Sequence, residues 1–369
     1  MSERKLLLLF SIVLILIMIP SVFAQDNDTL AADNPEDIYF DCNATTDHGM
    51  GTQDDPYREL RDGRILDNSE IHLKNGEYNY SQLNSHSNVS FIGQDASKTI
   101  INGQGSTLLI NTQLKLTNLT LFNLSIINQG NLIASNVIFT NSSAMKSGGY
   151  GGAIYCSNQN YNAYLTNCTL TNNYATFGGA IYLNGGILEI TDCIFLNNTA
   201  FNFGGAIACD SKSSPKVTVK RSKFIHDSSI NGAGGAIYLK SAIFSGEDLN
   251  ISSCSAAIGG AFALLKSDIK LTNVNAFNNS AKYDGGVIYQ MYGNLALTDS
   301  VFIENNAQNG GALFIYNSSS GSVEHNSFIN NSAEFLAGAF YSLYNGLKIN
   351  NTYLNNTALM HNDSFRQDN

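Results

Sequence analysis

The sequence contains no tryptophan, only 4 prolines and little charge, since Asp, Glu, Lys and Arg make up 14% of its 369 residues. Hydrophobic residues make up 43%, which is enough for a core and, together with the low charge, excludes a disordered chain. Acids outnumber bases by 30 to 20, which disfavours nucleic-acid binding. The 47 asparagines and 32 glycines are typical of repeated tight turns, not of long helices.

The N-terminal segment, up to Ala24, has the features of a secretory leader. A short basic start precedes an apolar run over residues 6–19, and small residues stand near Ala24, where a signal peptidase would cut. We expect a signal peptide over residues 1–24, with an uncleaved anchor as the alternative. No later stretch reaches the roughly 18 apolar residues that a membrane helix needs. The rest is therefore expected to be secreted or held at the cell surface or envelope, touching a membrane only through an uncleaved leader.

A glycine phrase recurs along the second half of the chain. It begins as Gly151-Gly152-Ala153-Ile154, returns at Gly179, Gly205, Gly235, Gly260, Gly286 and Gly311, and ends as Ala337-Gly338-Ala339-Phe340. Counted at the second glycine, the phrase returns at a nearly constant spacing of roughly 26 residues. A fixed period of this size is the signature of a solenoid, in which each unit buries its apolar face against its neighbours.

The segments between the glycine phrases alternate apolar and polar residues and break at Asn, Gly and Ser, as in residues 188–200. This pattern indicates short strands joined by turns. The sequence therefore predicts an all-β fold, a right-handed parallel β-helix of roughly 26 residues per coil over residues 71–369, with the clearest repeats at 150–358. Residues 25–70 are predicted to form an N-terminal segment and cap, in which residues 57–66 form a short helix with Leu60 and Ile65 facing inward.

Two sets of equivalent positions are predicted to form columns along the solenoid. An apolar position in each glycine phrase predicts an inward column: Ile154, Ile181, Ile207, Ile237, Phe262, Ile288, Leu313 and Phe340. A position rich in Asn and Asp predicts a structural ladder at a corner: Asn136, Asn167, Asp192, Arg221, Asp248, Asn273, Asp299, His325 and Asn350.

The six cysteines are interpreted mainly as buried free thiols. Cys156 and Cys209 share a column but are separated by Leu183, which puts their sulfurs about 9.6 Å apart. Cys168 and Cys193 lie in adjacent coils, about 4.8 Å apart, with parallel side-chain directions that are poor for a disulfide, so a bridge is the less favoured alternative. No Cys-x-x-Cys or Cys/His pattern has metal-ligand spacing, and no metal or cofactor is expected.

Three acidic arrangements are the only candidates for catalysis. Asp192 and Asp248 flank Arg221, Asp299 precedes His325 by one coil, and His226-Asp227 is an adjacent pair. A polysaccharide lyase or glycoside hydrolase needs neighbouring carboxylates on an exposed face. Because the first two arrangements belong to the corner ladder, we interpret them as structural and expect no catalytic residues.

The candidate binding residues form an aromatic stripe, one residue after the inward column. They are Tyr155, Tyr182, Tyr238, Tyr289, Phe314 and Tyr341, interrupted by Ala208 and Ala263. The period-two rule places them on the outer side of their strands, where they either bind sugars or proteins or stack on one another across coils.

Two families carry similar phrases. Gly204-Gly205-Ala206-Ile207 and Phe328-Ile329-Asn330-Asn331 resemble the repeats of chlamydial polymorphic membrane proteins. The opening, with Asp55-Pro56-Tyr57 and Lys74-Asn75-Gly76-Glu77-Tyr78, is similar to the adhesin-like surface proteins of methanogenic archaea. The resemblance implies an exported right-handed β-helix displayed at a cell surface.

The leading hypothesis is an exported, non-catalytic, adhesin-like protein that binds glycans or cell-surface proteins through a lateral face. Sixteen Asn-x-Ser/Thr triplets, among them Asn43, Asn88 and Asn197, predict a glycoprotein. The alternatives are a polysaccharide lyase or glycoside hydrolase of the β-helix class, and a purely structural envelope component.

Overall fold

The computed structural model describes residues 36–366 except 81–85, 146–147, 161, 212, 318–319 and 344–345. The predicted signal peptide lies outside the described residues. The predicted fold class is confirmed: parallel strands of successive coils stack on one another, and the one helical element in the described part is the 3-10 turn η1 (Asp62–Arg64). In those residues no helix is long and apolar enough to cross a membrane.

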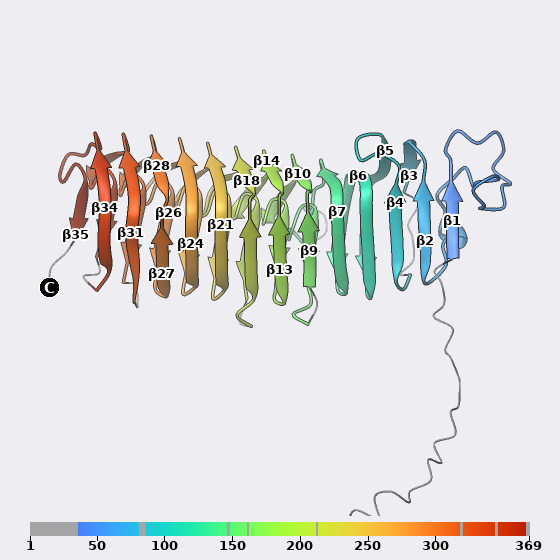
Figure 1. Ribbon diagram of the computed structural model, residues 1–369, viewed down its shortest axis with the longest axis horizontal. Helices are drawn as coiled ribbons and strands as arrows, with labels where there is room; N and C mark the ends of the chain where they lie inside the picture. The colour runs from blue at the N-terminus through green and yellow to red at the C-terminus, as the bar shows by residue number, and fades with distance from the viewer. Residues whose placement is uncertain are drawn as a thin grey trace, which may run out of the picture. The chain divides into compact units, whose positions relative to one another are not determined.

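The first face of the β-helix runs along the whole described unit, and Figure 1 shows its strands side by side in chain order. Its strands pair in parallel, and several of them continue around a corner into the next face. They are β1 (Glu36–Phe40), β2 (Ser69–Leu73), β4 (Val89–Gly93), β6 (Gln113–Asn128), β7 (Asn131–Thr140), β9 (Asn162–Thr166), β13 (Ile187–Thr191), β17 (Lys216–Lys220), β21 (Ile243–Ser252), β24 (Asp268–Phe277), β27 (Asn294–Thr298), β31 (Ser320–Ile329) and β34 (Lys348–Leu354).

The second face shares the long strands β6, β7, β21, β24, β31 and β34 with the first. Its other strands are β3 (Gly76–Asn79), β5 (Thr99–Ile110), β10 (Thr169–Thr171), β14 (Ile194–Leu196), β18 (Lys223–Ile225) and β28 (Val301–Ile303). Phenylalanines stack inside it, as Phe195 on Phe224 with ring centroids 4.7 Å apart and Phe302 on Phe328 at 4.9 Å. Aligned rings one coil apart fill the core with a repeated contact.

The third face is a sheet of seven short strands. They are β11 (Tyr174–Phe177), β15 (Thr199–Phe203), β19 (Ser228–Ser229), β22 (Ser255–Ala256), β25 (Ser280–Ala281), β29 (Asn306–Asn309) and β32 (Ser332–Leu336).

The fourth face follows the glycine doublets and includes the ends of β5 and β6. Its other strands are β8 (Ile154–Cys156), β12 (Ile181–Leu183), β16 (Ile207–Asp210), β20 (Ile237–Lys240), β23 (Phe262–Leu265), β26 (Ile288–Met291), β30 (Leu313–Tyr316), β33 (Phe340–Ser342) and β35 (Ser364–Arg366).

The inward column predicted from the glycine phrases is confirmed. Its eight members pair in register from Ile154 to Phe340, and each is at most 1% exposed. The glycine doublets occupy equivalent positions in successive coils. A Cβ at Gly205 would lie 2.0 Å from the carbonyl oxygen of Gly235, so only glycine allows the coils to approach this closely.

The corner ladder is also present, with one correction. Eight of its nine residues, Asn136 to His325, have left-handed backbone, with φ between 46° and 58°. Asn and Asp tolerate this conformation, which turns the chain between the first and second faces. Asn350 is not part of the column, because the register shifts between Glu324 and Asn326 and Asn350 pairs with Glu324.

A second ladder, not identified from the sequence and here called the inner ladder, lies inside the corner between the second and third faces. Its members are Asn173, Asn198, Asp227, Cys254, Asn279, Asn305, Asn331 and Asn356, all at most 3% exposed. Asn305 shows the repeated pattern: its Oδ1 accepts from the backbone N–H and the amide of Asn279, and its Nδ2 donates to the Ala276 carbonyl at 3.1 Å. These bonds satisfy buried backbone groups where the chain turns.

The predicted helix over residues 57–66 is wrong. Only η1 forms, with Arg61 and Ile65 extended on either side, because Tyr57 is held in a parallel bridge to Phe40 and Gly63 weakens a longer helix. Leu60 and Ile65 are nevertheless 3% exposed, as expected for inward residues. β1 lies within the segment predicted as an N-terminal cap.

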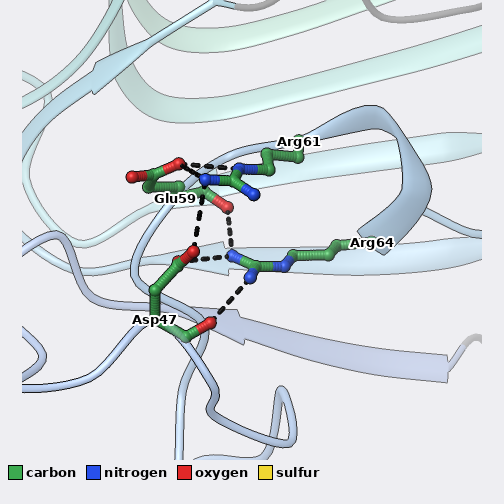
Figure 2. Close-up of polar contacts among 4 residues, drawn as sticks. All are labelled: Asp47, Glu59, Arg61 and Arg64. Carbon is green, nitrogen blue, oxygen red and sulfur yellow. Dashed lines mark hydrogen bonds and ion pairs between the residues drawn. The ribbon is translucent and has the colours of Figure 1, made fainter.

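Ion pairs hold the loop that carries η1. Figure 2 shows Asp47 bonded to both Arg61 and Arg64, with Glu59 bonded to Arg61. The Arg64 guanidinium bonds both the carboxylate and the carbonyl of Asp47, at 2.9 and 2.7 Å, and lies over the Tyr57 ring. The bond from Arg64 keeps the pKa of Asp47 below its usual value. Since every arginine and acid of this network is paired within it, we interpret it as structural.

Candidate functional site

The predicted aromatic stripe lies on the outer side of the fourth face. Tyr155, Tyr182 and Ala208 are in register with one another, as are Tyr289, Phe314 and Tyr341. Yet the rings are largely covered: Tyr182 is 7% exposed, Tyr238 is 5%, and Phe314 and Tyr341 are each 9%. Tyr155 and Tyr289 are half-buried.

The cover comes from the chain that leads into each glycine doublet. Phe177, Phe203, Ala233 and Ile258 pack on the rings of the first part of the stripe, and Leu336 and Ala337 pack on the second part. The Phe203 ring stacks on Tyr238, with centroids 4.5 Å apart. Burial raises the pKa of Tyr238 to about 12. The stripe is therefore mainly a second hydrophobic layer outside the solenoid core, and its rings stack across coils.

A polar groove of about 740 Å³ lies at the ends of β8, β12 and β16, three strands of the fourth face. It crosses four successive coils, and amide and hydroxyl side chains predominate among its residues: Gln129, Ser157, Asn158, Gln159, Tyr182, Asn184, Asp210, Ser211 and Ser213. Tyr182 is the only member of the predicted stripe in this lining, and its hydroxyl donates to the Asp210 carbonyl at 3.4 Å.

The groove wall is held by hydrogen bonds between coils. Ser211 Oγ donates to the Asn184 carbonyl at 2.9 Å, and Asn184 Nδ2 donates to the Ser157 carbonyl at 3.4 Å. The hydroxyl of Ser157 is buried and has no hydrogen-bond partner. These bonds between coils preorganise the groove wall.

The groove contains one carboxylate, and this group is paired. Asp210 Oδ2 accepts from Lys240 Nζ at 3.0 Å. Glycoside hydrolysis ordinarily uses two carboxyl groups that flank the bond to be cleaved. Among the described residues that line this groove, Asp210 is the one carboxylate, and the other side chains offer mainly amide and hydroxyl groups.

The structure does not assemble two of the catalytic arrangements considered from the sequence. Arg221 binds both oxygens of Asp192, at 2.8 and 2.9 Å, and this bond lowers the pKa of Asp192. Asp248 accepts from Asn273 at 2.6 Å instead of converging with Asp192. Asp227 is buried in the inner ladder while its neighbour His226 is exposed.

One cluster of possible metal ligands was missed from the sequence. Asp37 of β1 and Glu70 and His72 of β2 have ligand atoms within 4.8 Å of one another. Glu70 and His72 alternate along one strand, which is a usable signal. Asp37 and Glu70 pair in register although they are farther apart in the sequence than one period of the glycine phrases. The repeat spacing therefore did not indicate that Asp37 lies beside Glu70 and His72.

All six cysteines are free, and five of them are buried, as the favoured interpretation predicts. Cys156 and Cys209 both pair in register with Leu183, which separates them. Burial raises the pKa of each of these two thiols to about 12, so both are unreactive at neutral pH. Cys193 Sγ accepts from the backbone N–H of Cys168 at 3.3 Å without forming a bridge.

Comparison with known proteins supports the resemblance to chlamydial repeats. Residues 167–184 and 192–210 match the Chlamydia polymorphic membrane protein repeat. The chain is 28% identical over 246 residues to the probable autotransporter YfaL of Escherichia coli (strain K12), an alignment that covers 61% of this chain. The chain spans about 18% of that relative's length. No solved structure matches.

Proposed function

We propose that this chain is the β-helical part of an exported surface protein and acts as a non-catalytic, adhesin-like binding module for glycans. Its display at the surface is supported by the leader-like residues 1–24 and by the similarity to a probable autotransporter and to polymorphic membrane protein repeats. The glycan-binding role is supported by the polar groove that crosses four coils at the ends of the first strands of the fourth face.

The groove carries the proposal because its chemistry matches sugar hydroxyl groups. Amides and hydroxyls both donate and accept, so they pair with the hydroxyls of a sugar in either direction. The lining residues come from four consecutive coils, and three coil spacings amount to about 14 Å. An extended oligosaccharide along the solenoid axis would meet polar side chains from each of these coils.

The aromatic stripe contributes indirectly to this role. Its covered rings pack against one another on the fourth face, and Tyr182 is part of the groove wall. The competing class is a polysaccharide-cleaving enzyme. The single, Lys240-paired carboxylate of the groove favours binding over cleavage.

The test is retention of the purified chain on immobilised polysaccharides and on a glycan array. Gln129→Ala with Gln159→Ala removes two exposed amides from the groove. Each lost hydrogen bond costs roughly 0.5–1.5 kcal/mol, so affinity should fall about 5- to 150-fold for the two together. The control variant Gln113→Ala with Gln308→Ala removes two amides outside the groove lining and should bind as the unchanged chain does.

Two results would overturn the proposal. One is equal retention of the groove variant and the control variant, which would place binding elsewhere. The other is release of shortened, newly reducing chains from the polysaccharide, which would support the enzyme class.

A further inference from the structure

The outer side of the first face carries a cluster of ligand-type side chains at its N-terminal end. Alternation along β1 and β2 puts Asp37, Tyr39, Glu70 and His72 on the same side, away from the buried Ile38 and Ile71. In register, Asp37 lies opposite Glu70, and Tyr39 lies opposite His72. Asp37 and His72 are therefore diagonal neighbours on adjacent strands.

Distances within the cluster are close to those of a coordination sphere. His72 Nε2 lies 2.9 Å from Asp37 Oδ1, and one ligand atom from each of the three residues lies within 4.8 Å of the other two. Zinc bound by nitrogen and oxygen at about 2.0–2.2 Å separates tetrahedral ligand atoms by about 3.3 Å. The cluster needs only small side-chain movements to reach that spacing.

The imidazole is already oriented by its surroundings. The Tyr39 ring stacks on His72 with centroids 4.7 Å apart and an interplanar angle of 14°, and Nε2 points to Asp37. A ring fixed in this way loses little freedom when it binds a metal. On the next strand, β4, Ser90 lies opposite Glu70 and Ile92 opposite His72, so β4 places no cation beside the cluster.

The charge balance favours a cation. Among the described ion pairs, His72 is the only basic partner of Asp37, and Glu70 has none. The nearby Arg64 and Lys74 are bound to other acids, Asp47 and Asp41. Two carboxylates and one imidazole therefore share a site with negative charge to neutralise.

We propose that Asp37, Glu70 and His72 form a binding site for a divalent transition cation, with zinc as the expected occupant. One imidazole nitrogen with two carboxylate oxygens suits zinc, whereas calcium takes six to eight oxygen ligands and magnesium keeps most of its water. Three protein ligands leave the fourth tetrahedral position to water. The site joins β1 to β2, so zinc would clamp the first two strands of the face together.

His86 shows why this cluster is distinct. It also contacts two aspartates, Asp62 and Asp67, but through opposite ring nitrogens, at 3.0 and 3.5 Å. Those two carboxylates therefore cannot share one ion with the imidazole between them.

The experiment is zinc titration of the full chain without a polyhistidine tag, by calorimetry, in a Cys42→Ser background that removes the half-exposed thiol. We expect one equivalent of zinc, lost or weakened at least roughly tenfold in His72→Ala and in Glu70→Gln. The control His325→Ala, an exposed histidine elsewhere, should keep full binding. Circular dichroism checks that each variant is folded, and cobalt in place of zinc gives a visible absorption band that depends on His72.

The proposal is overturned by zinc bound equally by the His72 and His325 variants, which would indicate an adventitious ion only. It is also overturned by the absence of stoichiometric binding to the Cys42→Ser chain. Displacement of zinc by equimolar calcium would likewise contradict the assigned ligand chemistry.

Discussion

Replacing Asp227 with asparagine should stabilise the protein, and the gain should grow with pH. Asp227 is the one acid in the inner ladder, and it is fully buried. Its Oδ1 accepts from the backbone N–H and the amide of Asn198, at 2.8 and 2.9 Å, while its Oδ2 has no partner. In the asparagine rungs the corresponding atom is an amide nitrogen that donates to a carbonyl one coil earlier, as Asn279 does to Ile251 at 3.0 Å.

Burial raises the pKa of Asp227 to about 8, so the folded protein holds this side chain protonated at neutral pH. Below about pH 4 the folded and unfolded chains are both protonated, and the group contributes its full stability. Between about pH 4 and pH 8 the unfolded chain ionises while the folded chain keeps its proton. Stability from this group therefore falls as pH rises, by about 1.4 kcal/mol per pH unit, or about 4 kcal/mol at pH 7.

Asparagine has no proton to lose and keeps its amide donor at every pH, as the other amide rungs do. Urea unfolding of both proteins, followed by circular dichroism from pH 4 to pH 8, measures the difference at each pH. Asp227→Asn should gain about 1.4 kcal/mol per pH unit relative to the unchanged chain. A difference that is independent of pH, or a less stable variant at pH 7, would show that the fold does not hold Asp227 protonated.

Three further outcomes follow from the packing of the coils. Asn305→Ala should lower the free energy of unfolding by at least about 3 kcal/mol, because it leaves several buried groups of the inner ladder unpaired. Asn330→Ala, at the exposed, left-handed corner, should lower it by about 1 kcal/mol. Urea unfolding compares the two variants, and equal losses would contradict the role of the inner ladder. Gly205→Ala should destabilise the fold by at least about 3 kcal/mol, since the added Cβ would lie 2.0 Å from the Gly235 carbonyl oxygen. Gly63→Ala should change stability by less than about 0.5 kcal/mol, because a Cβ there would have no neighbouring atom within 4 Å. Iodoacetamide should label only Cys42 in the native protein and all six cysteines in urea, as mass spectrometry would show; resistance of a pair in urea without reductant would indicate a disulfide.

The repeated part of the fold was predictable because the glycine phrase recurs at a nearly constant spacing. The glycine doublets gave the coil register, and the inward column from Ile154 to Phe340 followed from it. Several residues of the inner ladder are the second asparagine of the Phe-x-Asn-Asn phrase, which lies between the glycine phrases. The inner ladder was missed because the sequence does not say which of two adjacent asparagines is buried.

The candidate site was harder to predict, because exposure depends on what covers a face. Alternation placed Tyr182 and Tyr238 on the outer side of their strands but could not show Phe203 and its equivalents packing over them. The groove is formed by turn residues whose positions depend on coil length. The metal-ligand cluster needs the pairing of β1 with β2 across a long connection, before the regular repeats begin.

The most direct test of the account is the rise per coil along one corner. Asn197, Asn278, Asn330 and Asn355 are exposed, left-handed residues of equivalent turns, and the last three lie three, five and six coils beyond Asn197. Spin labels on cysteines at these positions, in the Cys42→Ser background, should give distances from Asn197 of about 14, 24 and 29 Å by pulsed electron resonance, because each coil adds about 4.8 Å. Distances that do not grow in proportion to the number of coils would contradict the stacked β-helix and every residue column assigned from it.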